Sequence, residues 1–564
     1  MIIDTLSNII TNIANKLGYN ETLRVIKSNR PDLCDYQCDE VFKLAKTYHK
    51  SPIEIGEELV NKLNEIDNFN DYFEKIEFCR PGFINSTLSN KFINDSLKLM
   101  NNKDKFGYKN DDKKTYVIDY GGPNIAKPLH VGHLRPAIVG ESIKRIIDYT
   151  GNKTISDVHL GDIGLPIGEV IYACLRDKVS PNDITLDYLN KVYPEMSKLI
   201  KEDEQVKEEC ASIIKEVQDK TNYLDYWKKI CEVSILDIKR LYKYIDVNFD
   251  YWYSESDAYE YIPKVEKILE DKNLLKDSEG AKVVFINKDT DKIEYPPLIF
   301  KKSNGAYLYQ SSDLGTIYQR MQDFNPDYIL YVTDARQGMH FEQVFRVSKL
   351  SGMTTNTELL HLPHGTINGL DGKPYKTRSG DTPKLDELFN EVKEIFISKK
   401  ESNKNMDPKD IDKIVNSIIK FADFQNSRDK DYIFDINKFS DTQGKTGPYI
   451  LYSTVRMNSL LNKAKDIEFK EYKKYKNETD KDIILSLLKL PSVLSHSLEI
   501  KSLNEVTDYL YELTSKYNKF YAECRILDEE DKDLQESWLV LTKVVYEVNS
   551  LLLDILSIKV PEKM

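Results

Sequence analysis

The chain has 564 residues, too many for one hydrophobic core, and its 40% hydrophobic and 30% charged residues are typical of a folded protein rather than a disordered one. Its apolar runs, such as Tyr328–Val332, are far shorter than a bilayer-spanning helix, and its start lacks the pattern of a signal peptide, so we expect a cytoplasmic protein outside the membrane. The net charge of −12 does not exclude a nucleic-acid partner, because phosphate binding depends on local basic patches.

The first hundred residues favour helices and then strands. Apolar residues recur at helical spacing in Ile2–Leu17, Val41–Ala45 and Ile53–Leu63. Tyr72–Phe78 instead alternates as a strand does. Arg80-Pro81-Gly82 is a turn signal before Phe83-Ile84-Asn85. The polar stretch Asn101–Lys114 then predicts the end of an N-terminal α+β domain, which we place at residues 1–110.

The next part of the chain alternates strands and helices. Four short apolar segments are predicted strands: Tyr116–Tyr120, Thr154–His159, Tyr328–Thr333 and Leu359–Leu362. A Gly-Gly-Pro-Asn turn follows the first, and Leu134–Tyr149 is a predicted helix. This rhythm predicts an α/β fold, a doubly wound parallel (Rossmann-like) sheet over residues 111–400 with ligands beyond the strands' carboxyl ends. Charged helices and the β-like segment Lys282–Asn287 indicate an inserted domain at about 172–297.

From Asp410 onward the pattern is almost continuously helical. Three long helices are predicted at Ile483–Leu498, Leu503–Tyr521 and Trp538–Ile558, which indicates an all-α C-terminal bundle over residues 401–564. Six lysines between Lys463 and Lys476 are interleaved with two tyrosines. They indicate either a basic patch for nucleic acid or an ordinary solvated helix face, and the sequence leaves both interpretations open.

Seven cysteines are scattered along the chain, and an odd, dispersed set fits a reducing compartment. Cys34 and Cys38 have the spacing of half a metal site, but no second Cys or His pair follows at zinc-like spacing. We therefore expect no metal site and interpret these two residues as ordinary thiols on one helix face.

Two of the eight histidines flank a glycine in His130-Val131-Gly132-His133, between a predicted strand and a predicted helix. Free N–H groups and the dipole at a helix N-terminus attract anions, and Gly132 allows a base or ribose to approach the backbone. The imidazoles can donate to phosphate oxygens as negative charge builds on them. The plainer alternative is a histidine pair satisfied within a core turn.

A second polar segment, Asp371–Gly380, has glycines on both sides of basic and hydroxyl side chains: Lys373, Lys376, Thr377, Arg378 and Ser379. The cations suit a mobile loop that clamps polyphosphate, because they neutralise it while the glycines allow closure. Alone this signal is weak, since many basic, glycine-flanked loops are simply exposed to solvent.

Together the two segments resemble the HIGH and KMSKS signatures of class I aminoacyl-tRNA synthetases. Pro123–Arg135 reproduces the Pro-Asn-x-Ala-Lys-Pro-x-His-x-Gly-His-Leu-Arg motif of arginyl-tRNA synthetases. Further segments similar to that family extend over nearly the whole chain: Pro81–Asn85, Leu160–Asp162, Tyr307–Leu314, Asp334–Phe341, Asp431–Asp435, Gly447–Tyr452 and Pro561–Met564.

The resemblance implies an arginine–tRNA ligase that activates L-arginine with ATP to arginyl-adenylate and passes arginine to the 3′ end of tRNA. It implies ATP with Mg²⁺ as a substrate complex, no tightly bound cofactor, and an anticodon-binding role for the C-terminal bundle. We expect a monomer, and in this family activation generally requires bound tRNA. The implied tRNA contacts are Phe83, Asn85, Tyr449, Tyr452, Arg456 and Met564.

The resemblance also implies the residues of the active site. The catalytic set is Lys127, His130, His133, Lys376 and Arg378. ATP would contact these residues together with Gly132, Lys373, Thr377 and Ser379. The arginine pocket would consist of Asp119, Asn124, Tyr309, Asp313 and Gln337. Carboxylates and planar acceptors suit a guanidinium, whose five donors form a fixed fork.

The second loop departs from the family's pattern. If Tyr375–Arg378 aligns with Met-Ser-Lys-Ser, Thr377 replaces the usual second lysine and Lys127 would compensate; the register Lys373–Thr377 keeps Lys376 in that role. Other functions stay open as alternatives: another class I synthetase, a nucleotidylyltransferase with a His-x-Gly-His loop, or a non-catalytic tRNA-binding relative. The first would need a neutral or zinc-bearing pocket, and the second has no need of the helical C-terminal domain.

Overall fold

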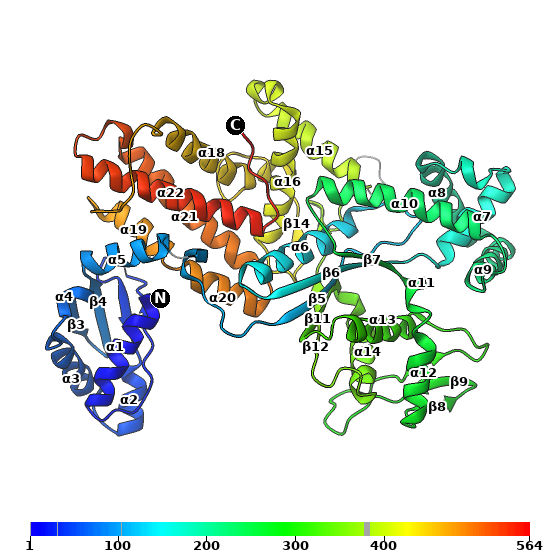
Figure 1. Ribbon diagram of the computed structural model, residues 1–564, viewed down its shortest axis with the longest axis horizontal. Helices are drawn as coiled ribbons and strands as arrows, with labels where there is room; N and C mark the ends of the chain where they lie inside the picture. The colour runs from blue at the N-terminus through cyan, green and yellow to red at the C-terminus, as the bar shows by residue number, and fades with distance from the viewer. Residues whose placement is uncertain (1, 31, 103, 377–383) are drawn as a thin grey trace. The chain divides into compact units, whose positions relative to one another are not determined.

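The computed structural model describes residues 2–30, 32–102, 104–376 and 384–564 (Figure 1). The chain forms two compact units. Unit 1 comprises Met1–Lys109, Ser453–His496 and Tyr509–Ser550. Unit 2 comprises Asn110–Tyr452, Ser497–Asp508 and Leu551–Met564. The predicted parallel α/β sheet lies within unit 2.

The N-terminal part of unit 1 is an α+β domain, as predicted. Its antiparallel sheet has the order β1-β2-β4-β3, with β1 Ile26–Lys27, β2 Tyr36–Cys38, β3 Phe73–Cys79 and β4 Phe83–Leu88. The helices are α1 Ile2–Lys16, α2 Val41–Tyr48, α3 Pro52–Asn64, α4 Phe69–Tyr72 and α5 Asn90–Asn101. The buried face of α1 is formed by Leu6, Ile10 and Ile13, which recur at helical spacing.

The prediction that Cys34 and Cys38 lie on one helix face is wrong. Cys34 precedes β2 and Cys38 ends it, so the two thiols do not share a helix face. Tyr36 and Cys38 are buried while Gln37 between them is half-buried, which is the two-residue alternation of a strand. The segment is too short for that alternation to be distinguished from helical spacing in the sequence.

The C-terminal part of the chain is all-α, as predicted. Its long helices are α18 Gly447–Lys463, α19 Glu478–Leu487, α20 Leu490–Ile500, α21 Asn504–Glu523 and α22 Lys532–Ile555. The predicted helix Ile483–Leu498 is two helices, α19 and α20, with Pro491 near the start of the second. The stretch Glu478–Ile500 is long and apolar enough to cross a membrane by composition, but half of it is buried inside the fold.

The lysine-rich segment is an irregular loop beside the start of α22 rather than a helix face. Three of its lysines pair with acidic residues there: Lys473 with Asp533 at 2.7 Å and Glu536 at 2.6 Å, Lys474 with Asp531 at 2.5 Å, and Lys476 with Glu529 at 3.4 Å. These carboxylates offset the charge, so the segment is not an unopposed basic patch.

The central sheet of unit 2 is parallel throughout, with the order β12-β11-β5-β6-β7. The four predicted strands are β5 Thr115–Tyr120, β6 Lys153–Leu160, β11 Tyr328–Asp334 and β12 Glu358–His364. The fifth, β7 Tyr251–Ser254, lies inside the stretch expected to be an insertion and pairs with β6 at the sheet edge. The chain therefore returns to the main sheet between two inserted parts.

The rest of unit 2 consists of helices and two smaller sheets. The helices from the first half of unit 2 are α6 Leu134–Tyr149, α7 Leu165–Asp177, α8 Leu186–Glu202, α9 Glu204–Gln218, α10 Leu224–Tyr244, α11 Glu255–Ala258 and α12 Ile262–Asp271. A small antiparallel sheet follows, with β8 Leu275–Ser278, β9 Ala281–Val284 and β10 Leu298–Lys301. Further elements are α13 Tyr309–Asp323, α14 Gly338–Leu350, β13 Ile367–Asn368, α15 Leu385–Ser398, α16 Pro408–Phe424, β14 Tyr432–Ile433 and α17 Ile436–Phe439.

One apolar core joins the central sheet to its neighbours. Val117 of β5 and Ile329 of β11 pack with Leu314 of α13, Val344 of α14 and Phe300 of β10, and all five are buried. Because α13 and α14 are fixed on the sheet in this way, the polar residues at their N-terminal turns are held at its carboxyl edge.

Candidate active site

A pocket of about 730 Å³ opens at the carboxyl edge of the central sheet. The strand order reverses there, since the chain runs from β5 to β6 on one side and from β11 to β12 on the other. Residues at the ends of four strands line the pocket, among them Asp119, His159, Thr333 and His364. This is the position at which a doubly wound sheet binds its ligands.

The histidine loop presents two preorganised imidazoles to this pocket. Nδ1 of His130 accepts the backbone N–H of Gly132 at 3.1 Å, and Nδ1 of His133 accepts the backbone N–H of His130 at 3.1 Å. A neutral imidazole whose Nδ1 accepts a hydrogen bond carries its hydrogen on Nε2. Each ring therefore keeps one N–H donor for a ligand, and the ring centroids lie 3.8 Å apart.

Both histidines are neutral at physiological pH. Burial, with the nearby Lys127 cation, lowers the pKa of His130 to about 4. Burial, together with His130 and Lys127, lowers the pKa of His133 to about 3. The imidazoles consequently act as hydrogen-bond donors rather than cations. Positive charge for a phosphate must come from other residues.

The inserted helix α10 holds the loop in shape. The Ser234 hydroxyl accepts the backbone N–H of Ala126 at 3.1 Å, where Ala126 has a left-handed φ of 67°. The Tyr242 hydroxyl donates to the carbonyl of Gly121, whose φ is 68°. A β-carbon on Gly122 would lie 2.2 Å from the carbonyl oxygen of His159, so this position requires glycine.

Arg135 fixes the start of the helix that follows the loop. Its side chain is 1% exposed and forms an ion pair with Asp423 of α16, with Nε 3.0 Å from Oδ2. Nη1 donates to the carbonyl of Lys430 at 2.7 Å, and the guanidinium lies over the Tyr432 ring. The first turn of α6 is therefore anchored to a helix outside the sheet.

The lining of the pocket also contains acidic residues. Asp119, Asp313 and Glu255 all line it, together with Tyr309 and Gln337. Oδ2 of Asp313 lies 2.5 Å from Nε2 of His340. Burial raises the pKa of Glu255 to about 7, and the nearby carboxylates of Asp313 and Asp162 add to the shift. A cation bound here would relieve the repulsion between these groups.

Asp119 has a buried partner. Nη2 of Arg320 donates to Oδ2 of Asp119 at 2.6 Å and to Oδ1 of Asp157 at 2.7 Å. Although burial opposes a charge on Arg320, the carboxylates of Asp157 and Asp119 raise its pKa well above the ordinary value, so it is a cation.

The pocket brings together seven of the residues predicted from the sequence: Asp119, His130, Gly132, His133, Tyr309, Asp313 and Gln337. It does not include Asn124, whose Oδ1 lies against Gly161, or the half-buried Lys127. Lys373 and Lys376 are exposed and also lie outside its lining. Thr377, Arg378 and Ser379 lie outside the described residues.

The predicted tRNA residues of unit 1 differ in exposure. Phe83 is half-buried, and its ring packs edge-on against Phe42 at 5.6 Å. Asn85 is 3% exposed, and its amide accepts from Gln37 at 2.8 Å and donates to the Cys79 sulfur at 3.2 Å. Arg456 donates to Asn518, and its guanidinium lies 4.4 Å from the Tyr521 ring centroid.

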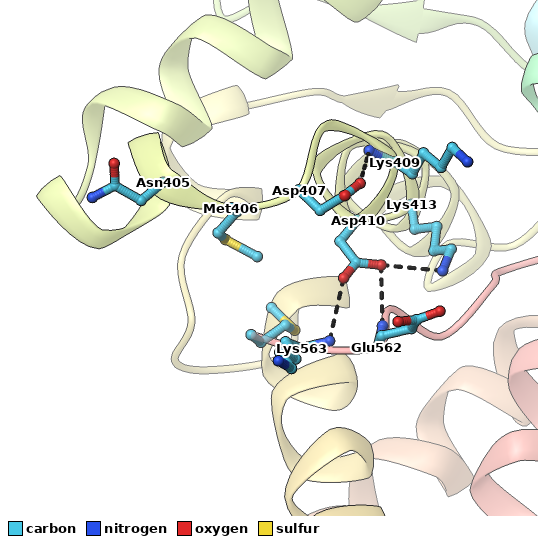
Figure 2. A pocket seen from close by; sticks show the side chains of 9 residues that line it. Asn405, Met406, Asp407, Lys409, Asp410, Lys413, Glu562 and Lys563 are labelled. Carbon is cyan, nitrogen blue, oxygen red and sulfur yellow. Dashed lines mark hydrogen bonds and ion pairs between the residues drawn. The ribbon is translucent and has the colours of Figure 1, made fainter.

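Met564 lies in a second pocket of unit 2, of about 470 Å³ (Figure 2). The Asp410 carboxylate accepts the backbone N–H groups of Glu562 at 3.0 Å and Lys563 at 3.3 Å, as Figure 2 shows. Lys413 donates to the same carboxylate at 3.1 Å. The chain's last residues are thus tied to the start of α16. Tyr449 and Tyr452 lie on α18, and Tyr452 is 46% exposed.

Sequence reasoning missed several lining residues. Five of the eight histidines line the main pocket, and His159, His340 and His364 had not been assigned to a site. His159 ends a predicted strand and His364 lies two residues beyond another, so the strand-end rule could have identified both. Glu255 directly follows β7, a strand that was not predicted, and no sequence signal marked it.

Three family models match the chain, and together they define its class. The model described as "tRNA synthetases class I (R), catalytic domain" matches residues 96–436. "Arginyl tRNA synthetase N terminal domain" matches residues 2–88, and "DALR anticodon binding domain" matches residues 450–564. The parallel sheet with a His-x-Gly-His loop at its strand-order reversal is therefore that of a class I aminoacyl-tRNA synthetase.

Full-length relatives narrow the class. The chain is 36% identical to the arginine–tRNA ligase of Alkaliphilus oremlandii and 37% identical to that of Agathobacter rectalis, and each match covers 100% of both chains. The chain belongs to the arginine–tRNA ligase family. Neither alternative, another class I specificity or a nucleotidylyltransferase, is supported by these matches.

Solved structures of arginyl-tRNA synthetases have the same fold as this chain. Arginyl-tRNA synthetase from Plasmodium falciparum superposes with a TM-score of 0.79 at 26% identity, over 100% of this chain and 99% of that one. The Thermus thermophilus arginyl-tRNA synthetase gives a TM-score of 0.79 at 19% identity over 100% of both chains, which shows a shared fold.

Proposed function

We propose that this arginine–tRNA ligase forms arginyl-adenylate in the main pocket, with ATP along the Pro123–His133 loop and arginine against the acidic wall. The observation that carries the proposal is that one cavity of about 730 Å³ is lined by two uncharged imidazole donors and by four carboxylates, those of Asp119, Glu255, Asp313 and Asp334. Asp119 and Asp313 belong to the arginine side, and His130 and His133 to the ATP side.

On the ATP side, the Nε2–H groups of His130 and His133 donate to phosphate and ribose oxygens. Because both rings are neutral, charge on the phosphates is offset by Mg²⁺, which enters with ATP, and by the basic residues of the two signature loops. The proposed ATP contacts are Lys127, His130, Gly132, His133, Lys373, Lys376, Thr377, Arg378 and Ser379. The influence of Lys127 on both histidine pKa values supports its placement near the phosphates.

On the arginine side, Asp119 and Asp313 accept from the guanidinium, and Tyr309, Gln337 and Asn124 complete the proposed pocket. A guanidinium stays protonated and presents its donors in a plane, so separated carboxylates select it over a neutral side chain. Burial raises the pKa of Glu255 to about 7, and the nearby carboxylates of Asp313 and Asp162 contribute to the rise, so a bound cation would also be close to this group.

The reaction has two steps. A carboxylate oxygen of arginine attacks the α-phosphorus of ATP, and pyrophosphate leaves with the electrons of the broken P–O bond. A ribose hydroxyl of the terminal tRNA adenosine then attacks the carbonyl carbon of arginyl-adenylate and loses its proton, and AMP leaves with the electrons of the broken C–O bond. The protein residues position the reactants and stabilise the charge that develops on the phosphate.

Kinetics with the full chain, ATP, Mg²⁺ and tRNA test this assignment. Asp313→Asn should raise the KM for arginine about ten- to a hundredfold, since a charge-assisted hydrogen bond is lost, and leave the KM for ATP within about twofold. An exposed acid, Asp277→Asn, serves as the control. ATP–pyrophosphate exchange with another amino acid and none with arginine would contradict the proposal.

For tRNA we propose contacts at Phe83, Asn85, Tyr449, Tyr452, Arg456 and Met564, with residues 1–110 and 401–564 as tRNA-binding domains and residues 111–400 as the catalytic domain. We further propose that the enzyme acts as a monomer in the cytoplasm. Tyr452→Ala should raise the KM for tRNA severalfold without changing the KM for ATP. An unchanged KM for tRNA would remove Tyr452 from the interface.

A further inference from the structure

Three neighbouring strands carry a row of polar side chains that begins at the main pocket, where Asp119 and Tyr331 belong to the lining. Asp157 of β6 is in register with Asp119 of β5, and Asp119 is in register with Tyr331 of β11. Residues paired across parallel strands point to the same face of a sheet. Arg320 of α13 lies over this row, with its guanidinium 5.3 Å from the Tyr331 ring centroid.

Arg320 reaches from the buried interior to the edge of the pocket. Its side chain is 1% exposed, that of Asp157 is fully buried, and that of Asp119 is 16% exposed. Nε and Nη2 of Arg320 form a two-bond fork with Asp157, at 2.9 and 2.7 Å. Nη2 also donates to Oδ2 of Asp119 at 2.6 Å. Among the described residues no donor bonds Oδ1 of Asp119.

The charges of this row leave the Asp119 carboxylate only partly compensated. Arg320 and Asp157 neutralise each other through the fork, whereas Asp119 takes only one of the hydrogen bonds of Arg320. Without Asp157, the buried guanidinium would be compensated by Asp119 alone, and Asp119 would attract a second cation less strongly. Arg320 and Asp157 together therefore orient the Asp119 carboxylate and leave part of its negative charge to attract a bound cation.

We propose that Arg320, balanced by Asp157, is a positioning residue for arginine recognition: it holds Oδ2 of Asp119 so that Oδ1 faces the substrate guanidinium. The inference rests on the proposed assignment of Asp119 to the arginine pocket. Because Oδ2 of Asp119 already accepts from Arg320, Oδ1 is the oxygen left for the substrate guanidinium. The guanidinium can bridge this oxygen to a second acceptor, and Asp313 lines the same cavity.

A double-mutant cycle tests the proposal in the full-length enzyme, with aminoacylation of tRNA as the assay. Asp119→Asn and Arg320→Lys should each raise the KM for arginine about ten- to a hundredfold, the cost of a lost charge-assisted hydrogen bond. The double variant should be no more than about threefold worse than Asp119→Asn, because Arg320 acts through Asp119. The KM values for ATP and tRNA should stay within about twofold.

Arg346→Lys is the matched control, since Arg346 lies on the neighbouring helix α14 and pairs with Asp291 away from the pocket. Independent effects of Asp119→Asn and Arg320→Lys that multiply in the double variant would overturn the proposal, because they would show a structural role alone. An unchanged KM for arginine in Asp119→Asn would instead refute the assignment of Asp119 itself.

If Arg320→Lys lowers the thermal unfolding midpoint so far that kinetics are not measurable, the isosteric Asp157→Asn replaces it in the same cycle. This variant should also raise the KM for arginine, because Arg320 then neutralises Asp119. Its effect should vanish in the Asp119→Asn background, and an effect that persists there would overturn the proposal.

Discussion

The histidine loop of unit 2 and the lysine-rich loop of unit 1 are two of the polar segments that the sequence marks as candidates for binding phosphate, and they differ in how their side chains are used. In the histidine loop, each imidazole bonds the backbone through Nδ1 and keeps Nε2 for the pocket. In the lysine-rich loop, Lys473, Lys474 and Lys476 are paired with the acidic start of α22.

The difference shows that the number of polar residues is a weaker guide to binding than the partners they already have. In the histidine loop, backbone N–H groups bond Nδ1 of each imidazole and hold the loop in shape, which leaves the side-chain donors available at a helix N-terminus beside a cavity. In the lysine-rich loop, the side-chain charges are paired with neighbouring carboxylates, and exposed pairs of this kind contribute little to stability. Four substitutions or conditions test this contrast.

The largest effect is expected at His133. His133→Ala should lower the rate of adenylate formation about a hundred- to a thousandfold, because a preorganised donor to the developing phosphate charge is lost, with tRNA affinity unchanged. His133→Gln, which retains an N–H donor of similar reach, should recover part of the rate, whereas His133→Asn should not. His496→Ala, at an exposed histidine on α20, is the control. Near-normal activation in His133→Ala would contradict the proposed role.

The burial of His133 also predicts a pH dependence of stability. The unfolded chain protonates this histidine below about pH 6.5, while burial lowers its pKa in the folded protein to about 3. The unfolded state therefore binds the proton first, and the free energy of unfolding should fall by about 2 kcal/mol between pH 7 and pH 5 through this group. Between pH 7 and pH 5, the thermal unfolding midpoint of the wild type should fall further than that of His133→Gln. An equal fall in both proteins would contradict the lowered pKa of His133.

A smaller effect is expected where α10 supports the loop. Ser234→Ala removes the acceptor of the Ala126 N–H, at a residue with a left-handed backbone. The lost hydrogen bond should lower kcat/KM for ATP about two- to tenfold. Ser234→Thr keeps the hydroxyl and should stay close to wild type. If both variants behave alike, the hydrogen bond does not control the loop.

The smallest effect is expected in the lysine-rich loop. Lys474→Ala should change the KM for tRNA by less than about twofold, because the lysine is already paired with Asp531. Asp531→Ala should be equally mild and serves as the partner control. A rise of tenfold or more in the KM for tRNA in Lys474→Ala alone would show that the lysine exchanges its carboxylate for a phosphate.

Much of the fold was predictable because long periodic segments carry their own signal. The helix Leu134–Tyr149 and the strands β5, β6, β11 and β12 have apolar patterns that match their final burial. The short edge strand β7 was missed, since four residues with half-exposed side chains have no distinctive periodicity. The break between α19 and α20 was missed because apolar residues continue across it.

The candidate site was predictable where residues close in sequence line the pocket together, as His130, Gly132 and His133 do. It was not predictable where the partner comes from another element. Arg320 lies 201 residues from Asp119, and Glu255 becomes part of the pocket through the position of β7. No pattern along the chain records such pairings.

The sequence by itself determined the family, the parallel α/β core, the helical C-terminal part and the loop that carries the two histidines. Those features depend on local periodicity and contiguous motifs, which a linear chain encodes directly. Only the tertiary structure decided the charge environment of each group. Arg320 donates to one oxygen of Asp119, burial keeps His133 neutral, and Asp531 pairs with Lys474. Electrostatic character depends on distances and burial between groups far apart in sequence, so it is fixed only when the chain has folded.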